Sequence, residues 1–322
     1  MSTFTSENFT LEVVKQTKNQ GVKTLTLHIT DRFDGSRHRV ERKAFSAFSR
    51  QLEKYLAKRP HLHFGHSRNI AQKLVYFPPS LRAWAAYMPG AFATYPVHNP
   101  DVKHLPTGKK IDYMTRNLFR HSIDAIGLRS RAYAMAWYVV TTLGDKKHAH
   151  WLSIASGTGQ QTFDAAALLT YPPQIYLTDI DDDAMKFAAL IGESQAIQKS
   201  QLHINKLDVM DEAAFVAYLK KVQPDVIDMM GLMEYLDDDQ AVTLVKTIIQ
   251  HAPKGCLFVF TNMLPTHPEL NLHKRGLGWP GVIVRSTSAS LKLLKKAGVQ
   301  DESISVLLPD DKVYAIFCIN IT

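Results

Sequence analysis

The spacing of apolar residues changes character about half-way along the chain. From residue 150 onward, short runs rich in β-branched and aromatic residues alternate with stretches in which apolar residues recur every three or four positions. This alternation of strand and helix patterns is typical of a doubly wound α/β domain. The expected strands are 150–155, 174–179, 201–207, 226–230, 256–261, 303–308 and 313–321, and the expected helices are 161–169, 182–198, 212–222, 238–251 and 287–297.

The end of this pattern departs from a purely parallel sheet. Only residues 309–312, with the sequence PDDK, join the last two expected strands, and strands joined by so short a turn must be antiparallel. The plain dinucleotide-binding arrangement does not end in such a hairpin. We therefore expect a doubly wound, Rossmann-like sheet of seven strands that finishes with an antiparallel hairpin.

The first half of the chain is less regular. Residues 11–16 and 22–29 flank an Asn-Gln-Gly turn and predict a β-hairpin, and the spacing over 41–58 predicts an amphipathic helix. Residues 78–106 are rich in proline and aromatic side chains and predict a loop-rich cap. A helical pattern over 111–143, interrupted at Gly127, leads into the first strand of the α/β domain. We expect an accessory region over 1–110 and an α/β domain over 111–322, with 111–143 as its leading helices.

Charge divides the chain in a similar way. Residues 1–150 contain 24 of the 38 Lys and Arg but only 10 of the 30 Asp and Glu, so a basic half precedes an acidic half. A basic face attracts nucleic acid, anionic lipid or a phosphorylated small molecule. A solvated basic surface explains the same counts, because no run of five or more basic residues occurs.

Composition indicates an ordinary globular protein. Hydrophobic residues make up 45% of the 322 positions, which is enough for a full core. The N-terminus shows no signal-peptide pattern, and the longest apolar run, 132–143, is far short of the ~20 residues that span a bilayer. We expect a cytoplasmic protein in which Cys256 and Cys318 are buried, reduced thiols.

A glycine-containing loop follows the first expected strand of the α/β domain. Residues 153–161 read SIASGTGQQ, and glycine in such a loop lets the backbone approach a ligand closely. The next strand ends at Asp179, about 20 residues further on, where ribose hydroxyls need an acceptor. A third strand is followed by Asp208. Since the carboxyl ends of parallel strands meet at one edge, we expect a cofactor crevice there.

The order of the motifs then carries a family resemblance. The segments SIASGTGQQTFDAA, YLTDIDDDAM, KLDVMD and DVIDMMGLMEYL, with the terminal hairpin, resemble the ordered motifs of class I S-adenosylmethionine-dependent methyltransferases. The resemblance covers about residues 123–322. Within that superfamily, TNMLPTHPEL, WPGVIVRS and AIGLRSRA are similar to segments of a poorly characterised methyltransferase family. The resemblance implies S-adenosyl-L-methionine as cofactor and in-line methyl transfer to a small-molecule or lipid-like acceptor.

The resemblance implies a cofactor site, whose residues are assigned by matching each motif position to this sequence. Gly157 and Gly159 would face the methionine part of the cofactor, with Ala155 at the first glycine position. Ser153 stands where most of the superfamily has an acid that holds the cofactor's amino group. Asp179 would accept hydrogen bonds from the ribose hydroxyls. The full implied set is Ala155, Ser156, Gly157, Thr158, Gly159, Asp179, Ile180, Asp208, Val209, Met230 and Gly231, in which Asp208 and the Val209 backbone flank the adenine.

Catalytic residues are less constrained, because an in-line displacement depends mainly on the proximity and orientation of the acceptor. A base is needed only if the acceptor must lose a proton first. The candidates after the fourth and fifth strands are Glu234, Tyr235 and His267, with Asn262, Trp279 and Arg285 as neighbours. His267 lies in a proline-bounded loop, and a histidine there is a candidate base near neutral pH. Arg285 is a candidate to bind an acidic acceptor.

Other functions stay open at this point. An RNA methyltransferase is the second hypothesis, since aromatic residues are interleaved with the basic residues of the first half, although no RNA-binding module is recognisable. A cofactor-binding protein without transferase activity is the third, because the first loop is altered. Aminopropyl transfer is also compatible with such a crevice. The oligomeric state is not predicted.

Two further motifs are weighed and set aside. The segment Tyr171-Pro-Pro173 resembles the loop of amino-group methyltransferases, but that loop should follow the fourth strand. His61, His63 and His66 have a spacing that suits zinc, but no acid or cysteine accompanies them locally. We therefore expect no metal site.

Overall fold

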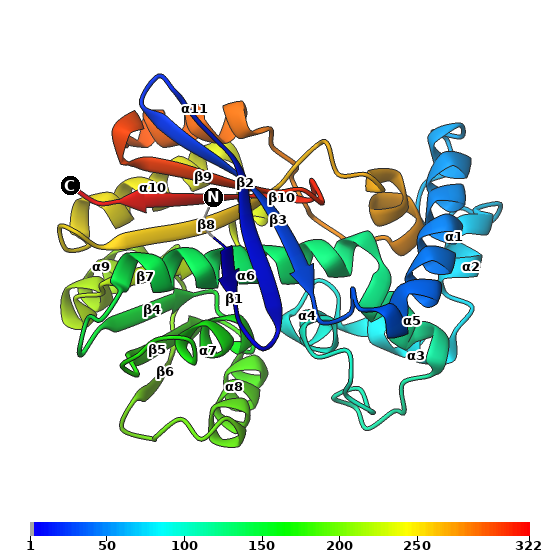
Figure 1. Ribbon diagram of the computed structural model, residues 1–322, viewed down its shortest axis with the longest axis horizontal. Helices are drawn as coiled ribbons and strands as arrows, with labels where there is room; N and C mark the ends of the chain where they lie inside the picture. The colour runs from blue at the N-terminus through cyan, green and yellow to red at the C-terminus, as the bar shows by residue number, and fades with distance from the viewer. Residues whose placement is uncertain (1–2) are drawn as a thin grey trace.

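Ten strands form a single mixed sheet in the computed structural model, which describes residues 3–322 (Figure 1). In spatial order they are β1 (Thr3–Thr5), β2 (Phe9–Asn19), β3 (Val22–Asp31), β9 (Ile304–Pro309), β10 (Tyr314–Asn320), β8 (Leu257–Met263), β7 (Val226–Met229), β4 (His150–Ile154), β5 (Gln174–Asp179) and β6 (Leu202–Lys206). The strands from β6 to β8 run parallel, and β10 is antiparallel to both of its neighbours. The prediction of an α/β fold that ends in an antiparallel hairpin is confirmed.

The predicted strand number is wrong, because the sheet has ten strands and not seven. The N-terminal hairpin forms as expected, but its second strand pairs in parallel with β9, from Lys23 opposite Ser305 to Leu27 opposite Pro309. Without this pairing β9 would be an edge strand with unpaired backbone groups. The region expected to be an accessory therefore extends the sheet, and a domain boundary near residue 110 stays a prediction.

Helices cover both faces of the sheet. The α-helices are α1 (Arg39–Ala57), α2 (Ile70–Val75), α3 (Pro79–Trp84), α4 (Ala91–His98), α5 (Tyr113–His121), α6 (Ile123–Leu143), α7 (Gln160–Ala166), α8 (Asp182–Ser194), α9 (Glu212–Val222), α10 (Asp238–His251) and α11 (Thr287–Ala297). Single turns are η1 (Ser36–His38), η2 (Ala85–Tyr87), η3 (Met233–Tyr235) and η5 (Asp301–Ser303), and a π-helical segment spans Leu272–Leu277 (η4). Residues 3–322 contain no helix with the length and apolar character needed to cross a membrane.

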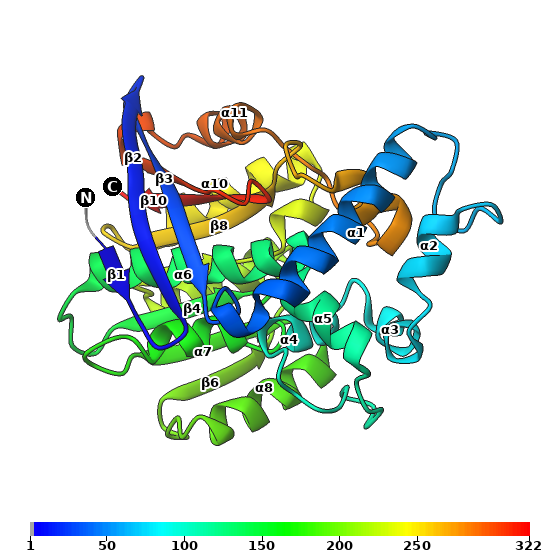
Figure 2. The same ribbon diagram turned by 45° about the vertical axis from the view of Figure 1, so that its right-hand side comes forward.

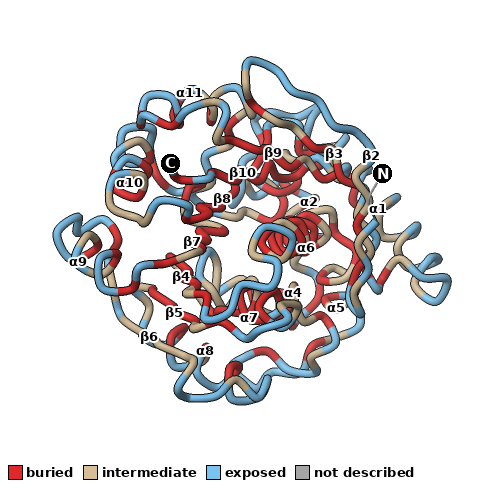
Figure 3. Tube along the Cα trace, turned by 60° about the vertical axis from the view of Figure 1, so that its left-hand side comes forward, coloured by how far each residue is buried: buried red, intermediate tan, exposed pale blue. Residues whose placement is uncertain are grey.

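The sheet separates two apolar layers, because successive side chains of a strand point to opposite faces. Phe258 and Phe260 of β8 lie in the layer covered by α9, α10 and α11, whereas Leu257 and Val259 lie in the layer covered by α6, α7 and α8. All seven residues of β8 are buried, as expected for a central strand. Figure 3 shows α6 as a largely buried helix against the sheet.

A third apolar cluster lies at one end of the sheet, where α1, α2, α3 and α5 gather (Figure 2). It joins Leu56 and Trp84 of these helices to Leu272 and Val313 of the C-terminal half. The prediction of a loop-rich cap over 78–106 is wrong, because α3, η2 and α4 form there. Burial of Trp84, whose indole Nε1 donates to the Ala93 carbonyl at 2.8 Å, fixes these short helices against one another.

The interruption of the 111–143 helical pattern lies at Ser122 and not at Gly127. The Ser122 hydroxyl accepts a hydrogen bond from the Ala125 N–H and begins α6, which continues through Gly127 without a break. A Cβ atom at residue 127 would lie 2.5 Å from the Val313 Cβ. Glycine is therefore used here for close packing against the turn before β10, and not to end the helix.

Candidate active site

A cavity of about 450 Å³ lies where the carboxyl ends of β4, β5 and β7 meet the helices of the N-terminal half. The loop after β4 and Asp179, at the end of β5, line one part of it. Side chains of α6, η3 and η4 line another part. The lining is mainly apolar with a few buried polar groups, as in most small-molecule sites.

The glycine loop has an unusual backbone and is covered by α4. Ala155, Gly157 and Gly159 have φ values of 48°, 56° and 68°, so three residues of the loop lie in the left-handed region. A Cβ atom at residue 157 would lie 2.7 Å from the Ala91 Cβ, which shows how closely α4 approaches. The hydroxyl oxygen of Ser156 is buried, lines the cavity end and has no hydrogen-bond partner within residues 3–322.

Asp179 connects the loop to the end of β5. Its Oδ2 accepts a hydrogen bond from the Gly157 N–H at 2.7 Å, and its Oδ1 accepts one from the Asp181 N–H at 3.0 Å. The carboxylate thereby fixes the loop and also lines the cavity. Each carboxylate oxygen keeps a lone pair for a further donor.

A buried carboxylate lies beside Ser153, in the register of the neighbouring strand. Asp228 of β7 is paired with Ser153 of β4, whose hydroxyl donates to Asp228 Oδ1 at 2.9 Å. The Trp151 indole N–H and the Thr162 hydroxyl donate to Oδ2 at 2.7 and 3.1 Å. Burial raises the pKa of Asp228 to about 6, although these donors lower it. The sequence therefore lacks an acid on β4 but has one on the adjacent strand, at the cavity wall.

Two histidines share one carboxylate where α6 and η4 meet beside the cavity. Asp124, in the first turn of α6, lies 2.6 Å from His273 Nδ1 and 3.2 Å from His267 Nε2, both measured to Oδ1. His267 Nδ1 accepts a hydrogen bond from the Glu269 N–H, so its proton is on Nε2 and is donated to Asp124. Charge and hydrogen bonds from these histidines lower the pKa of Asp124, although partial burial of its side chain opposes that shift.

The hydrogen bond to Asp124 determines which ring nitrogen of His273 carries the proton in the neutral ring. Because Asp124 is ionised, His273 donates its Nδ1 proton to it, and in the neutral ring Nε2 is left as a free lone pair. His273 Nε2 is buried and has no hydrogen-bond partner in the described part of the chain. The ring lines the cavity and stacks on Trp279 with centroids 6.4 Å apart. The geometry is that of a base whose tautomer is held by a carboxylate.

Glu234 and Arg131 form a second buried pair along the same wall. Arg131 and Thr261 donate to Glu234 Oε1 at 3.5 and 3.2 Å, and the Arg131 guanidinium lies over the Tyr314 ring at 4.5 Å. Burial raises the pKa of Glu234, and the charge of Arg131 opposes that shift. Glu234 Oε2 is buried and has no hydrogen-bond partner among residues 3–322.

Comparison with known proteins gives a fold and no family. No protein-family model and no curated protein sequence matches the chain. A protein described as a possible exported protein from Bordetella parapertussis has a similar structure, with a TM-score of 0.60, 14% identity, and coverage of 88% of this chain and 97% of that one. At this identity the likeness concerns the fold alone.

Solved methyltransferases are also similar, at lower TM-scores. Magnesium protoporphyrin IX methyltransferase from Synechocystis PCC 6803, solved with bound SAH, has a TM-score of 0.48 at 11% identity, over 66% of this chain and 89% of that one. Mitomycin 7-O-methyltransferase has a TM-score of 0.44 at 19% identity, over 66% of this chain and 58% of that one.

The structure brings most of the predicted site residues to one cavity. Among the predicted residues, those that line it are Ala155, Ser156, Gly157, Thr158, Asp179, Ile180, Met230, Gly231, Glu234 and Tyr235. Those outside the lining are Gly159, Asp208, Val209 and His267. Arg285 also lies outside it: its guanidinium donates to the Met233 and Leu236 carbonyls and pairs with Asp238. Arg285 therefore holds the loop after β7 and is not exposed to an acceptor.

Sequence reasoning missed Asp124, Arg131, Asp228 and His273. Arg131 and Asp228 lie in the segments AIGLRSRA and DVIDMMGLMEYL, but the family resemblance gave neither of them a role, and Asp124 directly precedes the first of these segments. His273 lies in η4, a π-helical segment, and such segments occur frequently at functional sites. Only the pairing of strands and the contact of α6 with η4 reveal these four residues as a group.

Proposed function

We propose that the protein is an S-adenosylmethionine-dependent methyltransferase that acts on a small-molecule acceptor. The observation that carries this proposal is that one cavity is lined both by the methyltransferase-like loop with Asp179 and by His273, whose Nε2 has no partner within residues 3–322. A volume of about 450 Å³ suits small ligands, whose sites are roughly 300–1,000 Å³. This size favours a small acceptor over a nucleic acid.

The residues at the loop end fit the proposed cofactor. Asp179 has lone pairs left for ribose hydroxyls, and Ser156 offers a buried hydroxyl without a partner. Asp228 supplies, from β7, the carboxylate that Ser153 does not supply from β4. We infer that Asp228 faces the cofactor's amino group. Asp208 and Val209 stay predicted adenine contacts.

S-adenosylmethionine would supply an electrophilic methyl group on a positively charged sulfur. An acceptor hydroxyl at the His273 end would form a bond to that methyl carbon as the carbon–sulfur bond breaks and its electron pair returns to sulfur. His273 Nε2 would take the hydroxyl proton, and Asp124 would stabilise the resulting imidazolium. The proposal therefore assigns the base to His273 and a positioning role to His267, which holds Asp124.

Glu234 and Tyr235 stay candidates for contact with the acceptor. Glu234 Oε2 is free to accept a hydrogen bond from a second polar group of the acceptor. The Tyr235 hydroxyl accepts the Trp279 indole N–H at 2.7 Å, which fixes two rings at the cavity wall. An aromatic or other flat acceptor is compatible with these rings.

Calorimetric titration with S-adenosylmethionine and S-adenosylhomocysteine tests the proposal. We expect the native protein to bind both, and Asp179→Ala to lose about 1.5–3 kcal/mol of binding free energy, because charge-assisted hydrogen bonds are removed. Asp182→Asn is the matched control, since its partner Lys206 is at the surface and both side chains are more than half exposed. Equal binding by native protein and Asp179→Ala, or no binding by the native protein, would contradict the proposal. Binding without methyl transfer to any of a wide range of acceptors would instead support a cofactor-binding protein.

A further inference from the structure

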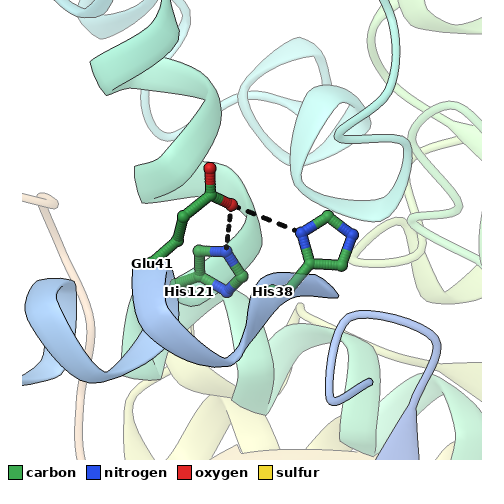
Figure 4. Close-up of side chains that lie close together, drawn as sticks. All are labelled: His38, Glu41 and His121. Carbon is green, nitrogen blue, oxygen red and sulfur yellow. Dashed lines mark hydrogen bonds and ion pairs between the residues drawn. The ribbon is translucent and has the colours of Figure 1, made fainter. Parts of the chain in front are cut away.

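A second group of histidines lies outside the cavity, where the connection after β3 meets the end of α5. His38 ends η1, Glu41 lies in the first turn of α1, and His121 is the last residue of α5. Figure 4 shows the three side chains converging from these two parts of the chain. His121 does not line the cavity, so this group is separate from the site described above.

The distances within this group are too long for good hydrogen bonds. Glu41 Oε2 lies 3.4 Å from His38 Nδ1 and 3.8 Å from His121 Nε2, and the three ligand atoms all lie within 4.8 Å of one another (Figure 4). Two ligand atoms bound to one tetrahedral zinc ion at 2.0–2.1 Å are separated by about 3.4 Å. The side chains are therefore spaced as ligands of a common ion.

His121 is the unexplained residue of this group. Its side chain is fully buried, and neither ring nitrogen has a hydrogen-bond partner within the range 3–322. A buried imidazole whose two nitrogens have no partner is costly to the fold unless another group binds it.

The surroundings of Glu41 prepare it to act as an anionic ligand. The Tyr113 hydroxyl donates to Glu41 Oε1 at 2.6 Å, and the other oxygen, Oε2, is the one that faces the two histidines. Such an outer hydrogen bond orients a ligating carboxylate. The nearby arginines, Arg42 and Arg129, are paired with Asp34 and Asp31, so their charges are balanced locally.

We propose that His38, Glu41 and His121 bind a zinc ion that joins the start of α1 to the end of α5. Two imidazoles and one carboxylate suit zinc, whereas calcium and magnesium require mainly oxygen ligands. His38 and Glu41 are partly exposed, so the fourth position opens toward solvent and would hold water. This inference is independent of the proposed methyl transfer.

The Asp124, His267 and His273 group meets the same distance criterion but differs in one respect. His267 Nδ1 already accepts a hydrogen bond from the Glu269 N–H, so Nε2 carries a proton. If His267 bound a metal through Nε2, its proton would move to Nδ1. That N–H would then face the Glu269 N–H, and two donors would oppose each other. In the His38 group, no N–H within residues 3–322 donates a hydrogen bond to either ring nitrogen of His121.

Zinc titration of tag-free, metal-stripped protein against a chromophoric chelator tests the inference. We expect one tight zinc ion per chain, and four-coordinate visible bands when cobalt replaces zinc. His121→Gln should weaken zinc binding at least ~100-fold because a direct ligand is lost, and Tyr113→Phe should weaken it about 10-fold as an outer-shell change. His38→Gln, at a partly exposed position, keeps the test valid if His121→Gln fails to fold.

The control variant is His63→Gln, which alters the histidine-rich segment without touching the proposed site. The rings of His63 and His66 lie against each other with centroids 5.3 Å apart, so this pair is a further place where zinc could bind. Unchanged zinc affinity in His63→Gln supports the inference. It is overturned if the native protein binds no zinc, if His38→Gln and His121→Gln bind it as tightly as the native protein, or if His63→Gln abolishes binding.

Discussion

At the scale of single residues, the cavity depends on polar groups whose states are set by their neighbours. Asp228 is surrounded by three donors but is fully buried, so its ionised form is only partly compensated. His273 keeps Nε2 free because its other ring nitrogen, Nδ1, donates a hydrogen bond to Asp124. The carboxylate of Asp228 and Nε2 of His273 can therefore each accept a hydrogen bond from a bound ligand.

Asp228→Asn is expected to stabilise the protein and to weaken cofactor binding. The folded pKa of Asp228, about 6, lies above the unfolded value of 3.8, so the folded state binds more protons than the unfolded state between these two pH values. The contribution of Asp228 to stability is therefore fully present below pH 3.8 and is lost as the pH rises through 6. The stability gained by the variant should reach about 2–3 kcal/mol at pH 8 and fall toward zero near pH 4.

Chemical denaturation of the native protein and Asp228→Asn at several pH values measures the difference in stability. Calorimetry measures the affinity of each protein for S-adenosylmethionine. We expect the variant to bind S-adenosylmethionine more than about 10-fold more weakly, since a charged hydrogen bond is worth roughly 1.5–3 kcal/mol. A pH-independent difference in stability would contradict the assigned pKa, and unchanged binding would contradict the contact with the amino group.

His273→Gln is expected to slow methyl transfer by about 10²–10⁴-fold, the usual contribution of a general base. The measurement is transfer of radiolabelled methyl from S-adenosylmethionine to whichever phenol or alcohol of a panel the native protein methylates. The variant should bind S-adenosylmethionine as tightly as the native protein, because His273 is proposed to contact the acceptor and not the cofactor. His251→Gln, at the C-terminal end of α10, is the control. Equal rates in His273→Gln and native protein would remove His273 from the mechanism.

At the scale of elements, buried charge fixes the helices around the cavity. Arg129 of α6 pairs with Asp31 at the end of β3 at 2.8 Å and donates to the carbonyls of Val97, Phe119 and Arg120. One side chain thereby connects the N-terminal hairpin, α4 and α5 to the central helix. These links span positions far apart in sequence, so they cannot be predicted from local patterns.

Arg129→Met should lower the free energy of unfolding by about 3–5 kcal/mol, because Asp31 would stay buried without its partner. Urea denaturation followed by circular dichroism provides the measurement. Arg32→Met removes a comparable pair with Asp101, but those side chains are 43% and 52% exposed, so its cost should stay below about 1 kcal/mol. If the two variants lost similar amounts of unfolding free energy, burial of the Arg129–Asp31 pair would make no extra contribution to stability.

Most elements of the C-terminal half could be predicted because their signals are local. The bounds of α9, α10 and α11 are those expected from periodicity, and a capping box formed by Asp237 and Gln240 begins α10. The loop after β4 and Asp179 were predicted for the same reason. The short helices of residues 78–106 were missed, because Trp84 and the surrounding packing, and not a periodic stripe, form them.

At the scale of the whole molecule, the first and second halves share one sheet and one apolar cluster. The parallel pairing of β3 with β9 crosses the expected boundary near residue 110, and so does the apolar cluster that contains Leu56 and Trp84 together with Leu272 and Val313. Sequence reasoning predicted the hairpin but not its partner strand, because register between distant strands leaves no local signal.

A fragment of residues 111–322 should therefore be insoluble or lack a cooperative unfolding transition. It would expose the edge of β9 and leave Arg129 without Asp31. Co-expression with residues 1–110 should recover soluble protein. A fragment that unfolds as cooperatively as the full chain would instead support an independent domain over 111–322.

The measurement that tests the central claim most directly is a crystal structure of the full chain with S-adenosylhomocysteine. The account predicts density in the cavity, with the ribose hydroxyls within hydrogen-bond distance of Asp179, the amino group toward Asp228, and the sulfur directed toward the His273 end. Density elsewhere, or an empty cavity at saturating ligand concentration, would contradict the assignment of this cavity to methyl transfer.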